Sequence, residues 1–432
     1  MEHPTATQYL EHAMYENAGD AFRPLQEWIE AGAAAQAALK IITWNVLHQG
    51  ALQRHARNPH TRELFSSTLS SQQRRAAFLR ILQGFVRSAQ PDVICLQELD
   101  VQWLSVKDSP AATALLQDYL PIVHGSIALL LRRDMLEAGS TPAAFFAKIN
   151  PQEMAGQKVM VENIPSTTPY VTHGILGATF QHRLHGTVAA LSLHLSTLPI
   201  EGRPLREWPA EFFATAKPPS QRSTGDSEYK ELVDLDLIPH TAPSGKNFLE
   251  LNNDRFTALG QHLRTFIETC IKPQNPALIV AGGDHNLHTH TLKPVNNIVR
   301  PFILPPDVLP LTELAVPAQT MIKEKITLRN AKVIEWANSW HKQTLDTLYA
   351  STACHTTFTA TTRAVSDGSP EGIDYIGTLR GKLHNAVVWP LIPQNTLVGV
   401  AHSQKDIHPV LPVWPGFYFP SDHLPVVGVV GP

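Results

Sequence analysis

Short apolar runs separated by polar turns are the main pattern along this chain. The runs 40–46 (KIITWNV), 92–96 (DVICL) and 277–281 (ALIVA) are apolar almost throughout, which is typical of buried strands. Further strand candidates are 126–131, 171–180, 187–193, 372–377 and 425–430. Because a strand that is apolar on both faces needs cover on both sides, these runs predict sheets buried between other layers.

Two segments with helical spacing lie between these strands, at 72–90 and 254–271. Each places its apolar side chains on one stripe of a helix. The stripes are Phe78, Ile81, Leu82, Phe85 and Val86 in the first segment, and Phe256, Leu259, Leu263, Phe266 and Ile267 in the second. Strands and helices therefore alternate, and we expect an α/β fold with stacked sheets and helices outside them.

The chain divides into one main domain with three additions. Residues 1–38 have helical spacing and predict an N-terminal helical extension, and residues 39–432 form the domain. The chain has 34 prolines, many of which fall in two tracts at about 198–252 and 292–340. Neither tract keeps a helical or strand periodicity over many residues. We interpret both tracts as insertions.

Composition narrows the class of protein. A formal charge of −3 over 432 residues gives no overall field that would attract nucleic acid or an anionic membrane. Three cysteines without paired spacing argue against a disulfide framework and suit a reducing compartment. The chain shows neither a signal-peptide pattern nor an apolar stretch long enough to span a membrane. We expect a cytoplasmic monomer, although a bacterial effector injected by a dedicated machine would have the same features.

Polar and charged side chains stand where the predicted strands end. Apolar strands that each end this way, at one rim of the sheets, predict a single acidic site with histidines, because ligands of α/β proteins bind at that rim. The residues are Asn45, Glu98, His194, Asp284, His285, Asn286, Asp374, Asp422 and His423.

The motifs around these residues resemble the endonuclease/exonuclease/phosphatase superfamily, which has the DNase I-like fold. They are W-N (44–45), L-Q-E (96–98), S-L-H-L (192–195), G-D-x-N (283–286), I-D-Y-I (373–376) and S-D-H-L-P (421–425). They follow the family's order across residues 40–430. The resemblance implies a four-layer sandwich of two mixed β-sheets flanked by helices. It also implies a divalent-metal-dependent hydrolase of phosphate esters.

Hydrolysis of a phosphate ester needs a metal to neutralise charge, a base to activate water and a donor to the phosphate. Glu98 is the candidate ligand for Mg²⁺, or for Mn²⁺, because these ions take carboxylate oxygens. Asn45 would orient that carboxylate or add an oxygen contact, and Asp422 would face the metal. Asp284 is the candidate general base, and Asn286 would bind the phosphate.

The histidines would contact the phosphate. The resemblance implies that His423 donates to a phosphate oxygen and that Asp374 is the carboxylate that keeps it cationic. His194 resembles the family's other phosphate-contacting histidine, although Ser192 stands where the family often has Asn. The family commonly has an apolar residue at position 285, so we expect His285 to alter substrate contacts. Together with His288 and His290 it has no regular ligand spacing, which argues against a zinc site.

The motifs look most similar to the deadenylase and 2′-phosphodiesterase branch, which includes nocturnin-like proteins. They favour a nucleic acid or nucleotide substrate. Seven arginines between residues 51 and 90, with Arg54 and Arg57 foremost, would bind a polyanion or form an ordinary solvated helix face. The others are Arg62, Arg74, Arg75, Arg80 and Arg87.

Two alternatives stay open at this point. The first alternative is a lipid phosphoesterase of the sphingomyelinase or phosphoinositide-phosphatase type, because sphingomyelinase-type members share the S-D-H pattern. The residues before Asp374 (S-P-E-G-I-D-Y-I) argue against the inositol-polyphosphate branch. A non-catalytic scaffold of the same fold is the other, and the presence of Glu98, Asp284 and His423 argues against it.

Overall fold

The structure is a computed structural model of the whole chain. It describes residues 22–23, 25–27, 29–30, 38–57, 70–107, 109–149, 156–164, 173–195, 264–285, 308–310, 363–364, 370–371, 374–389, 391–393, 420–421 and 423–432.

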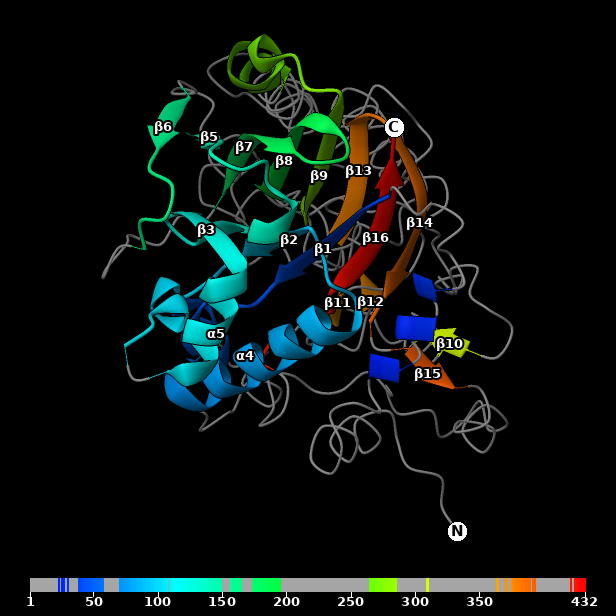
Figure 1. The fold of residues 1–432 in the computed structure, drawn as a ribbon. Helices are drawn as coiled ribbons and strands as arrows, with labels where there is room; N and C mark the ends of the chain where they lie inside the picture. The colour runs from blue at the N-terminus through cyan, green and yellow to red at the C-terminus, as the bar shows by residue number, and fades with distance from the viewer. Residues whose placement is uncertain are drawn as a thin grey trace, which may run out of the picture.

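One six-stranded sheet contains both the first and the last of the described strands, β1 and β16, side by side (Figure 1). Strand β1 pairs in parallel with β2 and antiparallel with β16, and the order across the sheet is β14-β16-β1-β2-β4-β3. The strands are β1 (Leu39–Asn45), β2 (Val93–Gln97), β3 (Tyr119–His124), β4 (Ile127–Arg132), β14 (Lys382–Val388) and β16 (Val426–Gly431). The central strands β1 and β2 are almost wholly buried, as their apolar sequences predict.

The second six-stranded sheet has the order β13-β9-β8-β7-β5-β6. It also contains one parallel pair, β8 with β9, between antiparallel neighbours. Its strands are β5 (Ala143–Lys148), β6 (Gln157–Val159), β7 (Gly174–His182), β8 (Gly186–His194), β9 (Leu278–Asp284) and β13 (Asp374–Arg380). Both sheets are therefore mixed; the parallel pair lies at the centre of the first sheet and directly beside the edge strand β13 in the second.

Helical segments cover the outer face of each sheet (Figure 1). Helix α4 begins with a capping box, in which Ser70 and Gln73 bond reciprocally, and it buries its apolar stripe against the first sheet. On the second sheet, Phe266 and Ile271 lie over Gly177 of β7. The helical segments are α3 (Gln49–Arg57), α4 (Ser71–Ser88), η1 (Val101–Leu104), α5 (Pro110–Asp118), η2 (Arg133–Met135), η5 (Ile267–Ile271) and η6 (Lys272–Gln274). Two small pairs, β10 (Val308–Pro310) with β15 (Leu391–Pro393) and β11 (Arg363–Ala364) with β12 (Pro370–Glu371), complete the described elements.

The two sheets pack face to face through small residues and buried hydrogen bonds. A Cβ atom on Gly282 would lie only 2.9 Å from Cβ of Thr43 in the other sheet, so glycine permits the close approach. Ser192 donates to the carbonyl of Leu96 at 3.2 Å and accepts from Gln97 Nε2 at 2.9 Å. The residue that departs from the family pattern therefore links the two sheets beneath the rim.

The predicted fold class, a sandwich of two mixed sheets with helices outside, is confirmed. In the two six-stranded sheets, four strands were not predicted, β3, β5, β6 and β14, because they are short, begin or end in polar residues or contain proline. The short strands β10, β11, β12 and β15 were not predicted either. Within the predicted helix 254–271, the described part is one α-helical turn followed by a π-helical segment.

The domain boundaries stay predictions. In the extension, the described residues 22–23, 25–27 and 29–30 are helical, and Phe22 stacks on Trp389 at a ring distance of 4.7 Å. The tract 198–252 lies outside the described residues, and so does 292–340 except for the strand β10.

Candidate active site

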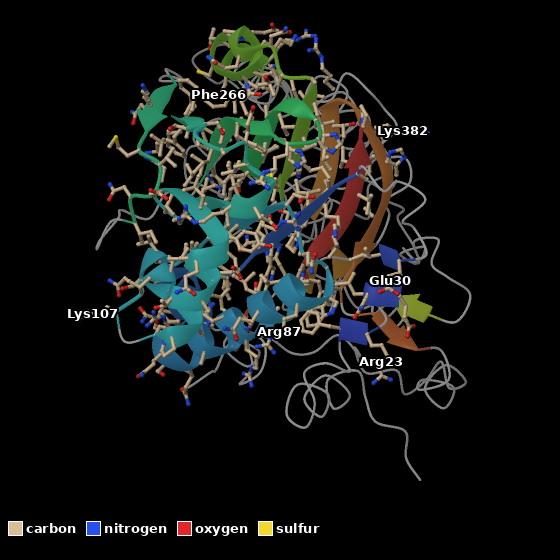
Figure 2. The ribbon with its side chains drawn as sticks, viewed as in Figure 1. Arg23, Glu30, Arg87, Lys107, Phe266 and Lys382 are labelled. Carbon is tan, nitrogen blue, oxygen red and sulfur yellow. The ribbon has the colours of Figure 1, made fainter. Side chains whose placement is uncertain are left out.

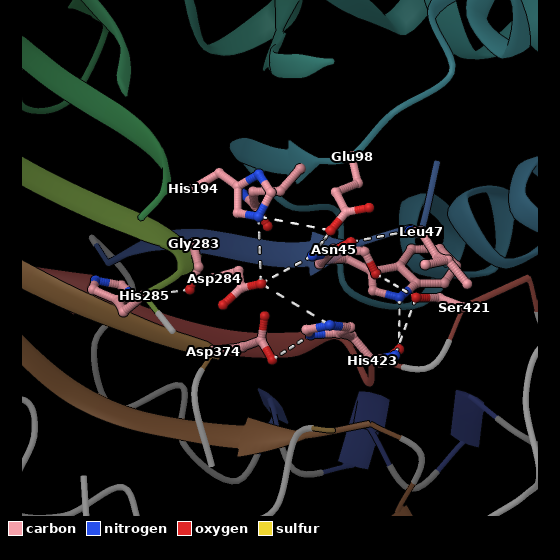
Figure 3. Close-up of polar contacts among 12 residues, drawn as sticks. Asn45, Leu47, Glu98, His194, Gly283, Asp284, His285, Asp374, Ser421 and His423 are labelled. Carbon is pink, nitrogen blue, oxygen red and sulfur yellow. Dashed lines mark hydrogen bonds and ion pairs between the residues drawn. The ribbon is translucent and has the colours of Figure 1, made fainter. Parts of the chain in front are cut away.

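The sheet register brings the predicted site residues into two short rows. In the first sheet Asn45 pairs with Gln97, and Glu98 follows directly. In the second sheet Asp284 pairs with His194 on one side and with Asp374 on the other. Because paired residues of neighbouring strands point to the same face, these three side chains meet the first row across the sandwich. Figure 3 shows the resulting cluster.

Asn45 links the two sheets at the centre of this cluster. Its Nδ2 donates to Glu98 Oε1 at 3.2 Å and to Asp284 Oδ2 at 3.0 Å. Its Oδ1 accepts from the backbone N–H of Leu47 at 3.0 Å, which fixes the orientation of the amide because only the oxygen can accept. Of the two predicted roles for Asn45, these contacts support the one in which it orients carboxylates.

Asp374 and His423 are in direct contact, as the resemblance implied. His423 Nδ1 donates to Asp374 Oδ2 at 2.9 Å across 49 residues of sequence, and both side chains are buried. The ring is held from its backbone as well, because Trp44 Nε1 donates to the carbonyl of His423 and Ser421 Oγ accepts from its N–H. His423 Nε2 is thereby turned toward Asp284 Oδ2, 4.0 Å away.

His194 lies on the other side of Asp284. Its Nε2 is 3.7 Å from Asp284 Oδ2 and 3.7 Å from Glu98 Oε1. Oδ2 of Asp284 thus has the Asn45 amide and two imidazoles around it. The side chain of Glu98 is the most exposed of these groups at 14 %, against 3 % for Asp284 and 4 % for His194. Glu98 therefore faces the opening of the site.

The backbone is strained where the first sheet enters the site. Glu98 and Leu47 have φ angles of 51° and 55°, which non-glycine residues rarely adopt. Such conformations persist only where surrounding contacts enforce them, and they are enriched at functional sites. Here the contacts include the Asn45 amide and the backbone N–H of His48, which donates to Glu98 Oε2 at 3.4 Å.

A buried arginine that was not predicted as a site residue holds the loops of the site together. Arg74 of α4 donates from Nη2 to the carbonyls of Val46 and Leu47, and from Nε at 3.0 Å to the carbonyl of Pro420. Its guanidinium also lies 4.9 Å from the ring centre of Trp103. One side chain therefore fixes both the segment after Asn45 and the segment before His423.

The prediction that Arg74 belongs to a surface basic patch is wrong. Its side chain is fully buried and is committed to backbone carbonyls, so it is not available to a polyanion. A signal was present, since Arg74 lies four residues before Phe78 on the buried stripe of the helix. The side chains of Arg54 and Arg57 lie outside what the structure describes.

Three other predicted residues remain to be placed. Asn286 and Asp422 lie outside the described residues. His285 is buried and its ring is turned away from the carboxylates, with Nδ1 donating to the carbonyl of Gly283 at 2.8 Å (Figure 3). Successive residues at a strand end point to opposite faces, so His285 diverges from Asp284. Its predicted effect on substrate contacts has no support from this position.

The donor set fits a hard divalent cation. Ligand atoms of Asp284, Asp374 and His423 all lie within 4.8 Å of one another, and Glu98 adds a carboxylate beside Asp284 through their shared Asn45 donor. Mg²⁺ takes carboxylate oxygens and keeps several waters, whereas Mn²⁺ also accepts imidazole. The carboxylate of Glu98 is partly accessible to such waters, with its side chain 14 % exposed.

A sequence model described as the Endonuclease/Exonuclease/phosphatase family matches residues 42–423. The match covers most of the chain and includes every site residue from Asn45 to His423, so the chain belongs to this family. Members of the family are generally hydrolases of phosphate esters. No curated protein matched the chain.

Several solved structures are similar at low sequence identity. ANGEL2, a 2′,3′-cyclic phosphatase, is 14% identical with a TM-score of 0.43, over 91% of this chain and 95% of that one. D. rerio TDP2 complexed with a single-strand DNA product is 14% identical with a TM-score of 0.35, over 92% and 100%. The Neisseria 3′ phosphatase NExo, bound to a product DNA hairpin, is 13% identical with a TM-score of 0.37, over 90% and 98%.

Within the described residues, no helix is both long and apolar enough to cross a lipid bilayer.

Proposed function

We propose that this protein is a divalent-metal-dependent phosphoesterase that hydrolyses a phosphate ester of a nucleic acid or nucleotide. The observation that carries the proposal is the position of Asp284. Its Oδ2 lies 3.0 Å from the Asn45 amide and within 4.0 Å of the Nε2 atoms of His194 and His423. A carboxylate in such a setting is surrounded by the groups that phosphate hydrolysis needs.

Asp284 is the general base of the proposed reaction. It takes a proton from the attacking water, whose oxygen forms a bond to phosphorus while the bond from phosphorus to the leaving oxygen breaks. The leaving oxygen is protonated from solvent. The Asn45 amide holds the carboxylate in place, because its Nδ2 bonds Asp284 and Glu98 together.

His423 and His194 bind the phosphate oxygens. Since His423 Nδ1 donates to Asp374, its Nε2 donates to a phosphate only when the ring is protonated, and a carboxylate partner favours that charged form. Asp374 is thus a positioning residue that orients the ring and supports its charge. His194 Nε2, between Glu98 and Asp284, faces the same space.

Glu98, with Asp422 from outside the described residues, would hold Mg²⁺ or Mn²⁺. When bound, the ion neutralises phosphate charge and stabilises the charge that develops in the transition state. Asn45 orients Glu98 toward it, and the strained backbone at Glu98 aims the carboxylate into the site.

The first experiment is a panel of substrates with Mg²⁺ and with Mn²⁺. The panel contains poly(A) RNA, DNA, 2′,5′-oligoadenylate, NADPH, sphingomyelin and inositol phosphates. We expect turnover of a nucleic acid or nucleotide, its loss in EDTA and its recovery with excess Mg²⁺. Undiminished turnover in chelator would refute the metal-dependent mechanism. Turnover of sphingomyelin or inositol phosphates alone would refute the nucleotide assignment and favour a lipid phosphoesterase.

A further inference from the structure

A cavity of about 810 Å³ lies between α4, the segment after η1, α5, β3 and residues 162–164. Its volume is in the range of sites for small organic ligands, roughly 300–1,000 Å³. Part of its wall is apolar, formed by Val106, Leu116, Pro121 and Ile164. Three cations, Arg75, Lys107 and Arg133, line the remainder together with amide side chains.

The cations of this cavity are only partly neutralised. Arg133 Nη1 bonds Glu162 Oε1 at 2.7 Å, so these two charges offset each other. Arg75 donates to the carbonyls of Trp103 and Ser105, which orient the guanidinium without neutralising it. The side chain of Lys107 is exposed and, within the part of the chain that the structure describes, has no hydrogen bond or ion pair, while the backbone N–H of Lys107 donates to Ser105 Oγ at 3.3 Å. The cavity therefore carries an excess of positive charge that an anion would balance.

The wall of the cavity also contains a strained residue. Glu162 has a φ angle of 63°, and its backbone N–H donates to the carbonyl of Pro121 at 3.0 Å. A left-handed conformation is unfavourable for a non-glycine residue, so the fold maintains an unfavourable conformation that places this carboxylate against Arg133. Two of the other described non-glycine residues with positive φ, Leu47 and Glu98, belong to the candidate active site.

The cavity is within reach of a substrate that occupies the active site. Gln102 of its wall follows Glu98 by four residues, so their Cα atoms are at most about 14 Å apart. Proteins that bind single-stranded nucleic acid combine cations, which contact the phosphates, with flat or apolar surfaces, on which the bases lie. A cavity with an apolar wall, amide side chains and cations that are only partly neutralised within the described residues matches the chemistry of a nucleoside phosphate.

We propose that this cavity binds a nucleoside phosphate of the substrate chain, away from the phosphate that is hydrolysed. The proposal rests on the proposed function above, because it assumes a substrate with more than one nucleotide. Lys107 and Arg75 bind the phosphate, and the apolar wall receives the base. The cavity would then make the enzyme favour an oligonucleotide over a dinucleotide.

The test measures binding and turnover in the full chain. Binding of a labelled single-stranded oligonucleotide is measured by fluorescence anisotropy in the Asp284→Asn background, where turnover is slow. Lys107→Glu should weaken binding about tenfold, because it replaces an attraction with a repulsion. Lys107→Ala should reduce the slope of log K against log salt by about 0.7, the value for one phosphate contact on a single strand. In the active protein, Lys107→Glu should raise KM for the oligonucleotide more than KM for a dinucleotide.

The matched control is Lys382→Glu. Lys382 is also an exposed lysine, but it lies on β14, at the opposite side of the molecule from Lys107 (Figure 2). The same change of charge there should leave binding and turnover as in the parent. If Lys107→Glu and Lys382→Glu weaken binding equally, the cavity is not a subsite. The proposal would also be overturned if AMP bound in the cavity but did not change the KM of the enzyme for the oligonucleotide.

These outcomes are separable from those of the proposed function. If the unmodified protein hydrolyses neither an oligonucleotide nor bis(p-nitrophenyl) phosphate, the proposed function fails. If it hydrolyses oligonucleotides and Lys107 behaves as Lys382 does, only the cavity proposal fails.

Discussion

Two groups of histidines lie near opposite ends of strand β8 and have opposite surroundings. At the rim, His194 faces Glu98 and Asp284. At the other end, in the β7–β8 turn, the tilted rings of His182 and His185 lie with their centroids 4.6 Å apart, and their buried Nε2 atoms have no hydrogen-bond partner within the described residues. A nine-residue strand separates these ends by about 27 Å.

Burial without a carboxylate partner and contact with carboxylates act in opposite directions on the pKa of a histidine. Burial lowers the pKa of His182 to about 4, with repulsion from His185 and Arg132 adding to it. Burial also lowers the pKa of His185. This pair is therefore neutral at physiological pH. At the rim, carboxylates face each imidazole, and such partners favour the charged form that binds phosphate.

The largest expected effect comes from the carboxylate at the centre of the rim. Asp284→Asn keeps the shape and removes the base, so kcat should fall on the order of 10²–10⁴-fold while KM changes little. Steady-state kinetics on the accepted substrate measures both. Asp92→Asn is the matched control at the far end of β2, where that carboxylate bonds Arg132 at 2.9 Å. The control should lower stability and retain kcat. Near-normal kcat in Asp284→Asn would mean that another residue is the base.

The second prediction concerns the Asp374–His423 pair. His423→Ala should lower kcat on the order of 10²-fold, and the double variant with Asp374→Asn should be hardly worse, because the two residues act as a unit. In Asp374→Asn alone, the high-pH limb of the kcat profile should move to lower pH, since the ring loses the partner that favours its proton. If the two losses of kcat multiply in the double variant, and the high-pH limb of the kcat profile does not move in Asp374→Asn, then Asp374 acts independently of His423.

The third prediction tests the link between the loops of the rim. Arg74→Lys retains the charge but cannot reach all of the carbonyls of Val46, Leu47 and Pro420, so the free energy of unfolding should fall by about 2–4 kcal/mol. Urea unfolding with an unchanged m-value measures this loss. Arg75→Lys, whose guanidinium reaches two carbonyls from a half-buried position, is the control and should lose less. If Arg74→Lys and Arg75→Lys lose equal free energies of unfolding, Arg74 contributes no more to stability than Arg75 does.

The smallest expected effect is at the far pair and depends on pH. Because the pKa of His182 is lowered in the folded state, the unfolded chain binds more protons between about pH 4 and pH 6.5. Stability should therefore decline as the pH falls through this window and be independent of this group above it. His182→Asn keeps an acceptor for the N–H groups of Leu184 and His185 and removes the titration. Chemical unfolding at several pH values should give a flatter profile for His182→Asn, and an unchanged profile would assign the decline to other groups.

Much of the fold was predictable from local pattern. The strands that carry the site were located to within one to three residues, because a strand buried on both faces requires an unbroken apolar run. The strands β3, β5, β6 and β14 were missed because they lie at or next to a sheet edge, where partial exposure tolerates polar residues and proline. Helix α4 was predicted almost to its ends, since its apolar stripe is continuous.

Within the site, local pattern sometimes held information that was not used. The alternation of side chains along β9 separates His285 from Asp284, and extension of the stripe of α4 places Arg74 on its buried face. Ser421 was not predicted to act, yet its hydroxyl accepts from the N–H of His423 and donates to the carbonyl of Asn45 at 2.6 Å. Its place in the S-D-H motif was the available signal.

The sequence by itself determined which segments are buried strands, which polar residues stand at their ends and which family the motifs resemble. These features depend on residues near one another in the chain. Only the tertiary structure decided that one amide nitrogen of Asn45 joins Glu98 and Asp284, which are 53 and 239 residues away from it. It also decided that Arg74 binds a carbonyl 346 residues further on. Such contacts follow from strand register and from the stacking of two sheets, and no local periodicity encodes either.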